Sequence, residues 1–188
     1  FMADLNPVHM VEEIRANIST GDSMKARLVL DHLASIDEKT RNLIIYELHK
    51  ADATFSVPLL CYLLDEHRGV AEEIPAIRET LVSHLLAYPE MINTFLSSPD
   101  ISDKTHIINL VGELKHEEST PFLLDLVTSS SDEAEIKLII DTLGELGDPQ
   151  AVNTLTDFMY AANRDLIIAA IQALGQVGTS TAMHRLSE

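Results

Sequence analysis

Near its C-terminus the chain carries nearly the same sequence twice, as TLGELGDPQAVNTL (Thr142–Leu155) and as ALGQVGTSTAMHRL (Ala173–Leu186). Apolar residues lead into both copies at steps of three and four, which places them on one face of a helix. A polar turn follows each helix, and a second amphipathic stretch begins after it. Each copy therefore predicts a helix, a tight turn and a second helix.

Two glycines occupy the same places in both copies, and each place has its own structural meaning. Gly144 and Gly175 lie inside the helical pattern, where a glycine costs roughly 1 kcal/mol. Close contact with another helix is the usual compensation, so we expect one at both positions. Gly147 and Gly178 follow the last apolar residue, where a left-handed residue commonly ends a helix. We therefore expect both to end the first helix of their copy.

The same pattern recurs upstream with a period of 31 or 32 residues. A dipeptide marks the expected second helix of each copy, and in three copies its second residue is a proline, which suits the first turn of a helix. These dipeptides are Ala26-Arg27, Val57-Pro58, Tyr88-Pro89, Thr120-Pro121, Val152-Asn153 and Met183-His184. A fixed period of this length is typical of a solenoid. The expected repeats are residues 5–35, 37–67, 72–97, 102–129, 133–161 and 164–188, the last of them truncated.

The repeat in residues 132–160 resembles a HEAT repeat, and specifically the short HEAT-like type also seen in phycobilisome bilin lyases. Residues 102–129 and 163–186 match the same pattern, whereas residues before 100 match it weakly. The resemblance implies an all-α fold, a right-handed superhelical solenoid of about six helix pairs. It also implies that the second helices line a concave surface used for binding.

Composition and charge narrow the class of protein. The chain has 46% apolar and 23% charged residues, as soluble globular proteins do, and it has no apolar run long enough to span a membrane. Its start lacks the pattern of a secretory signal, so we expect a cytoplasmic protein. The net charge of −17 disfavours binding to nucleic acid and to anionic membranes, because both carry negative charge. It favours either mere solubility or a basic protein partner.

The expected second helices carry acidic and hydrogen-bonding residues on the side opposite the apolar core. We therefore predict that a partner, another protein or peptide with a basic segment, binds along a groove lined by these residues. The predicted contact residues are Asp31, Tyr62, Asn93, Asp125, Asn153, Asp157, His184 and Glu188. The alternative is that these residues form an ordinary solvated face of an acidic protein.

The sequence offers little for catalysis or for a cofactor. It contains no HExxH, paired CxxC or EF-hand motif, so we expect no metal and no cofactor despite eight histidines. Cys61 lies in an apolar run, and we expect it to be buried. We predict a scaffold or adaptor that binds another protein, and no enzyme. The alternatives are a lyase or chaperone that handles a bilin or tetrapyrrole, which only the resemblance implies, and a structural segment of a larger protein, which the truncated last repeat favours.

Overall fold

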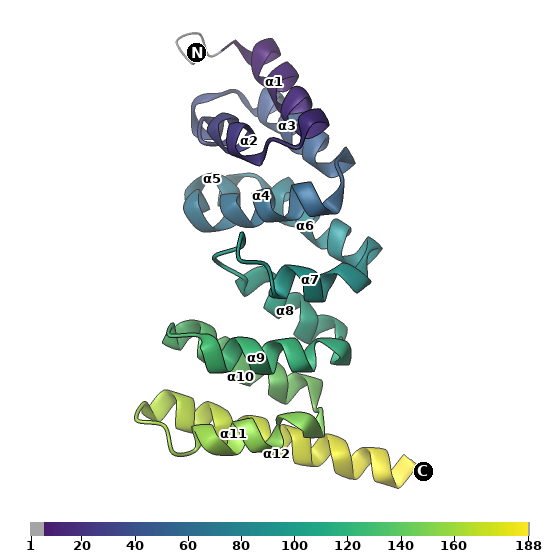
Figure 1. Cartoon of the computed structure of the whole chain (residues 1–188), viewed down its shortest axis with the longest axis vertical. Coiled ribbons are helices and arrows are strands. Elements are labelled where there is room, and N and C mark those ends of the chain that lie inside the picture. The colour runs from purple at the N-terminus through teal and green to yellow at the C-terminus, as the bar shows by residue number, and fades with distance from the viewer. Residues whose placement is uncertain (1–5, 188) are drawn as a thin grey trace. The chain divides into compact units, whose positions relative to one another are not determined.

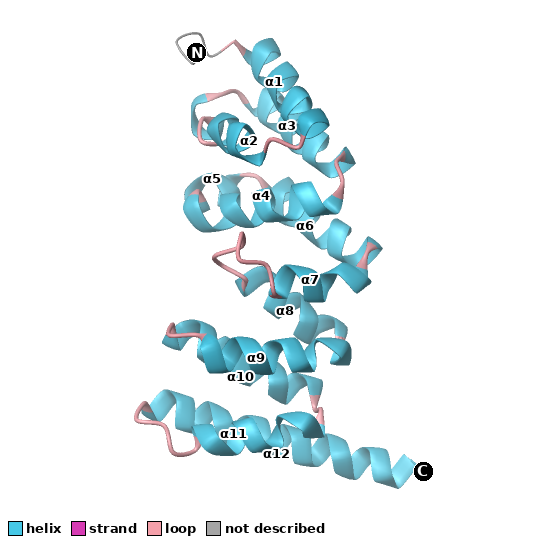
Figure 2. Ribbon diagram, in the orientation of Figure 1, coloured by secondary structure: helices cyan, strands magenta, loops and turns pink. Residues whose placement is uncertain are grey.

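The structure is a computed structural model, and it describes residues 6–187 (Figure 1). Every regular element in this range is helical and none is a strand (Figure 2). The helices divide into two compact units. Unit 1 contains the described residues up to Met91 together with Asp100–Asp103, and unit 2 contains Ile92–Pro99 and the described residues from Lys104 onward. The predicted all-α fold is therefore confirmed.

Unit 1 is built from helices in two layers. Its elements are α1 (Pro7–Thr20), α2 (Ser23–Leu30), η1 (Leu33–Ser35), α3 (Glu38–Lys50), α4 (Ala53–Glu66), α5 (Arg68–Glu73), α6 (Pro75–Ala87) and η2 (Pro89–Met91). The first helices α1, α3 and α6 pack in succession, while α2 packs against α1 and α4. Fully buried aliphatic side chains such as Ile14, Ile44, Leu60 and Leu81 fill the space between the layers. This stacking buries apolar faces that a single helix pair would leave in water.

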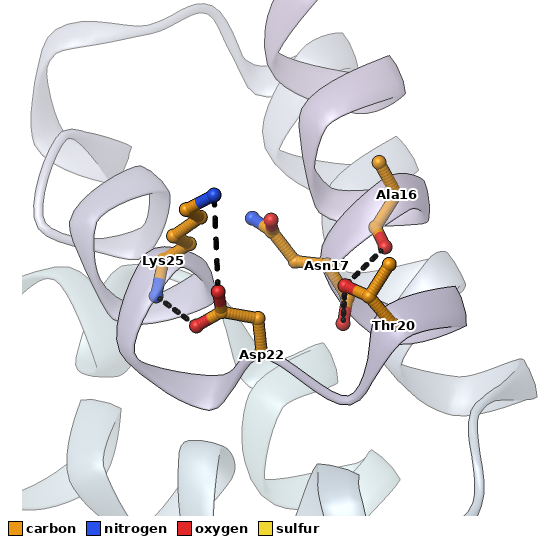
Figure 3. Close-up of polar contacts among 5 residues, drawn as sticks. All are labelled: Ala16, Asn17, Thr20, Asp22 and Lys25. Carbon is orange, nitrogen blue, oxygen red and sulfur yellow. Dashed lines mark hydrogen bonds and ion pairs between the residues drawn. The ribbon is translucent and has the colours of Figure 1, made fainter.

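The turn between α1 and α2 shows how the chain reverses within a pair (Figure 3). Gly21 ends α1 in the left-handed conformation, with φ at 69°, and the next backbone N–H, that of Asp22, donates to the carbonyl of Asn17. The Asp22 carboxylate then caps α2 by accepting from the backbone N–H of Lys25 at 3.0 Å. Thr20 closes the end of α1 by donating its hydroxyl to the carbonyl of Ala16 (Figure 3). The two helix ends are thus satisfied locally.

Unit 2 repeats the two-layer arrangement. Its elements are α7 (Ile92–Leu96), α8 (Thr105–Leu114), η3 (Glu117–Ser119), α9 (Thr120–Ser129), α10 (Glu133–Leu146), η4 (Pro149–Ala151), α11 (Val152–Phe158) and α12 (Arg164–Ser187). The first helices α8, α10 and α12 pack in succession, and α7 and α9 form the second layer with α11 against α12. Helix pairs of HEAT-like length therefore recur in both units.

The glycines of the two similar C-terminal sequences differ in their structural roles. Gly147 ends α10 with φ at 69°, as predicted. A Cβ added at Gly144 would lie 2.8 Å from the Cα of Ala173, so the predicted close approach of two helices is confirmed there. Gly175 has no such neighbour, because nothing in the described part of the chain lies within 4 Å of an added Cβ.

The prediction of a sixth helix pair is wrong for residues 164–187, which form the single helix α12. Gly178 lies within this helix and does not end it. The local sequence gives the reason. Gly147 precedes Asp148, whose carboxylate accepts from the N–H of Gln150 and begins a new element, whereas Thr179 after Gly178 donates back to the carbonyl of Gly175 within the helix.

The register predicted for the upstream second helices also needs correction. Pro58 lies in the interior of α4, which begins one turn earlier at Ala53 because Asp52 caps it. Tyr88 was expected in a second helix, but it is the C-cap residue of α6 and is 48% exposed. Cys61 is buried as predicted. The prediction was wrong about where these helices begin and end, whereas their helical type and apolar faces follow the prediction.

Candidate functional site

Two of the predicted contact residues, Asp31 and Tyr62, lie side by side in unit 1. The Tyr62 hydroxyl donates to Oδ1 of Asp31 at 2.5 Å, and Nε2 of His67 lies 2.8 Å from the same oxygen. The guanidinium carbon of Arg27 lies 4.7 Å from the centroid of the Tyr62 ring, in a cation–π geometry. We call Arg27, Asp31, Tyr62 and His67 the Asp31 cluster. It joins the C-terminus of α2 to α4 and to the residue that precedes α5.

The hydrogen bond between Asp31 and Tyr62 changes the pKa of both groups. It is the main reason why the pKa of Tyr62 rises to about 12, with partial burial as the next cause. Burial alone would raise the pKa of Asp31, but the hydrogen bonds from Tyr62 and His67 outweigh it and lower that pKa. At neutral pH Asp31 is therefore an ionised acceptor and Tyr62 a neutral donor. The positive charge of Arg27 lies beside them, so the cluster is not a bare negative charge.

Exposed apolar side chains flank the Asp31 cluster on α2. Met24 is 71% exposed and Leu28 is 53% exposed. Together with Arg27 and Asp31 they follow the spacing of three and four residues that places side chains on one face of a helix. We call Met24, Arg27, Leu28, Asp31 and Tyr62 the second-helix face of unit 1. It combines apolar area with a polar cluster whose geometry is already fixed.

Asn93 in unit 2 is used for internal contacts. Its side-chain N–H donates to the carbonyl of Glu118 at 3.2 Å, and its side-chain oxygen accepts from the hydroxyl of Ser119 at 2.7 Å. Ser119 is fully buried and also contacts Nδ1 of His116 at 2.8 Å. Asn93 therefore links α7 to the segment before α9, and both ends of its amide are occupied within the unit. Its predicted contact with a partner stays a prediction.

Three other predicted contact residues of unit 2 lie exposed on second helices. Asp125 lies on α9, and Asn153 and Asp157 lie on α11. Phe122 and Val152 on the same two helices are each 38% exposed. We call these five residues the second-helix face of unit 2. Neither α9 nor α11 contains a lysine or an arginine, so no cation on these helices offsets the two carboxylates.

The last two predicted contact residues belong to no second helix that the structure describes. His184 is exposed near the end of α12, which is a first helix, so its predicted place in a sixth pair is wrong. Glu188 lies outside the described residues. Within the described range, no group of three or more histidine, cysteine, aspartate or glutamate side chains could hold a metal ion. No helix in that range is long and apolar enough to cross a membrane.

Arg27 and His67 belong to the Asp31 cluster but were not predicted from the sequence as site residues. The proximity of Arg27 to Asp31 could have been predicted, because Arg27 lies four residues before Asp31 on the same helix. His67 had none, since it is 36 residues from Asp31 and occupies the break between α4 and α5. A long-range contact of this kind depends on how neighbouring pairs stack.

A comparison with known families agrees with the geometry. The sequence model of HEAT repeats matches residues 88–175, which run from the end of α6 into α12. No curated protein matches the chain significantly. The narrower resemblance to the repeats of bilin lyases is not tested by this match and stays a prediction. Repeated helix pairs, two-layer stacking and the family match agree with one another: residues 88–175 of the chain are similar to HEAT repeats.

Proposed function

We propose that this chain is a binding module, without catalytic activity of its own, that takes a basic segment of another protein on its second-helix faces. HEAT repeats generally mediate protein–protein interaction or scaffolding. A cytoplasmic location is part of the same proposal. The basic character of the partner follows from the charges of the exposed side chains.

The observation that carries the proposal is the second-helix face of unit 2. Asp125 and Asp157 are exposed and project from two helices that carry no basic residue. Phe122 and Val152 add exposed apolar area on the same two helices. A basic segment with interspersed apolar residues complements both features, because its charges meet carboxylates while its apolar side chains leave water.

The second-helix face of unit 1 supports binding in a different way. Met24 and Leu28 offer apolar area, whereas the hydroxyl of Tyr62 and the carboxylate of Asp31 are held by each other. Groups that are fixed before binding lose less entropy when a partner docks. We expect this face to contribute contact area and orientation more than long-range attraction.

The experiment that tests the proposal uses a fluorescent peptide of alternating arginine and leucine, with a glutamate–leucine peptide as the control ligand. Replacement of Asp125 and Asp157 together by Asn should weaken binding of the basic peptide and flatten its salt dependence. The reason is that the Debye length falls from about 10 Å at 0.1 M to about 3 Å at 1 M salt. Fluorescence anisotropy at several salt concentrations measures both effects.

The matched control replaces two exposed acidic residues on first helices of unit 2, Glu113 by Gln and Asp165 by Asn. Asp141 is a poorer control, because its carboxylate pairs with Lys137 at 2.9 Å. Equal loss of binding in the two double variants would mean that only net charge matters, and the proposed face would be wrong. The bilin or tetrapyrrole alternative rests on repeat resemblance alone, and an absorbance titration with a bilin distinguishes it.

A further inference from the structure

A pocket of about 510 Å³ opens in unit 1 at the turn between α3 and α4. Its wall combines His49 and Asp52 from that turn with Ser83, His84 and Ala87 from the last turns of α6, and Tyr88 follows them. It shares no residue with the second-helix face of unit 1. Such a concave site with a few convergent polar groups is the usual form of a binding pocket.

Asp52 supplies a negative charge to this pocket. Its Oδ1 accepts from both the backbone N–H and the hydroxyl of Thr54, at 2.8 and 2.5 Å, and so caps α4. These two hydrogen bonds lower the pKa of Asp52, which keeps the carboxylate ionised at neutral pH. No described residue donates a hydrogen bond to its Oδ2, which leaves that oxygen available to a ligand.

His84 supplies a second acceptor. Its Nε2 lies 3.2 Å from the carbonyl oxygen of Leu48. A carbonyl can only accept, so Nε2 carries the proton, and in the neutral imidazole Nδ1 then bears a lone pair. The His84 side chain is only 7% exposed, yet Nδ1 makes no hydrogen bond to any residue in the described range. Nδ1 is not one of the described side-chain nitrogen and oxygen atoms that are both closed off from water and unpaired, so water can reach it in the free pocket and a ligand can replace that water.

Lys50 carries the one full positive charge on the pocket wall, and its ammonium group contacts residues outside the wall. Lys50 contributes to the wall, but its ammonium nitrogen lies 3.1 Å from Glu47 and 4.9 Å from the centroid of the Tyr46 ring. Neither Glu47 nor Tyr46 belongs to the wall. The ring of Tyr88 adds an aromatic face, which attracts cations. The pocket thus offers two acceptors and an aromatic wall, and its formal net charge is zero because Lys50 offsets Asp52.

We propose that this pocket binds the guanidinium group of an arginine side chain from a partner protein. The guanidinium has five N–H donors and no acceptor, which suits a wall with Oδ2 of Asp52 and Nδ1 of His84 as acceptors. The aliphatic part of the arginine would lie against Ala87 and Met91, which also line the pocket. The site goes beyond the second-helix faces and stands on its own observations.

The test uses the full chain and the peptide N-acetyl-Gly-Arg-Gly-amide. The expected result is a saturable shift of the His84 and His49 ring resonances in NMR spectra at neutral pH. The same peptide with citrulline, a neutral isostere of arginine, should bind about tenfold more weakly or worse, because it lacks the charge-assisted hydrogen bonds. Inorganic phosphate should leave both rings unshifted.

Two variants examine the pocket without unfolding it. Asp52→Asn keeps a good helix cap and removes the charge, so arginine binding should weaken by about tenfold. Asp37→Asn makes the same change at the cap of α3, outside the pocket, and should have no effect. Ala87→Leu fills the pocket and should abolish the shifts while leaving the polar groups in place.

Three results would overturn the inference: equal binding of the citrulline peptide, equal effects of Asp52→Asn and Asp37→Asn, or ring shifts caused by phosphate in place of arginine. Failure of the proposed function would look different. It would appear as unchanged binding of the basic peptide after substitution of Asp125 and Asp157, whatever the pocket does.

Discussion

Replacing Gly144 and Gly175 by alanine, one at a time, should change stability in opposite directions. Both glycines lie inside helices, so each alanine gains helix propensity of roughly 0.5–1 kcal/mol. At Gly144 the new Cβ would lie 2.8 Å from the Cα and 3.0 Å from the Cβ of Ala173, which forces α10 and α12 apart. Overpacking of this kind costs about 1–3 kcal/mol. We therefore expect Gly144→Ala to destabilise by about 1–2 kcal/mol.

At Gly175 an added Cβ meets nothing in the described part of the chain within 4 Å. Gly175→Ala should then stabilise by roughly 0.5–1 kcal/mol, since only the propensity gain applies. Urea unfolding followed by far-UV circular dichroism gives both free energies of unfolding. The reasoning is refuted if the two variants shift the midpoint in the same direction. A second check is Ala173→Gly in the Gly144→Ala background, which should rescue only partly because the shorter of the two contacts with Ala173 is to its Cα.

Four further substitutions and one titration address the core and the Asp31 cluster. Leu143→Ala should destabilise by about 2–5 kcal/mol in urea unfolding, because Leu143 is fully buried, whereas Asp141→Ala should cost under about 0.5 kcal/mol. In a titration followed by ultraviolet absorbance, Tyr62 should ionise near its raised pKa of about 12, and Asp31→Asn should return it towards 10. A raised pKa in the folded state stabilises at neutral pH, so this contribution should disappear as the pH rises from 10 to 12. Tyr62→Phe should lower the free energy of unfolding by roughly 0.5–1.5 kcal/mol at neutral pH and leave no such alkaline step.

The repeat period was readable from the sequence because each helix pair must bury the same kind of apolar face. The end of α10 was predicted correctly, because the left-handed backbone at Gly147 depends only on the local sequence. Gly144 was also predicted correctly, since a glycine inside a helix needs a close neighbour to compensate its cost. Gly175 looks identical in sequence, but its neighbour would have to come from a helix that packs on the other side of α12.

The helix ends that were predicted wrongly have a common physical origin. Helix starts and ends depend on capping side chains, which the pattern of apolar residues does not reveal. Pro58 suggested the start of a helix, yet the cap at Asp52 begins α4 a turn earlier. Gly178 suggested an end, yet the Thr179 hydroxyl after it donates back to the carbonyl of Gly175 and α12 continues. Caps depend on one side chain and one backbone N–H, so they can override a periodic landmark without disturbing the apolar face. The pocket at Asp52 was missed for the same reason.

The structure also changes which carboxylates can attract a basic partner. Asp31 accepts hydrogen bonds from Tyr62 and His67, and the guanidinium of Arg27 lies over the Tyr62 ring, so we expect less of the Asp31 field to extend into solvent. Asp125 and Asp157 have no cation on their own helices, so their fields reach further. We therefore expect Asp31→Asn to alter stability while the association rate of a basic peptide stays the same. The Asp125 and Asp157 double variant should do the reverse, slowing association most at low salt, where screening is weakest. Stopped-flow association rates and urea unfolding of both variants would separate the two roles, and a slower association after Asp31→Asn would return Asp31 to the group of attracting residues.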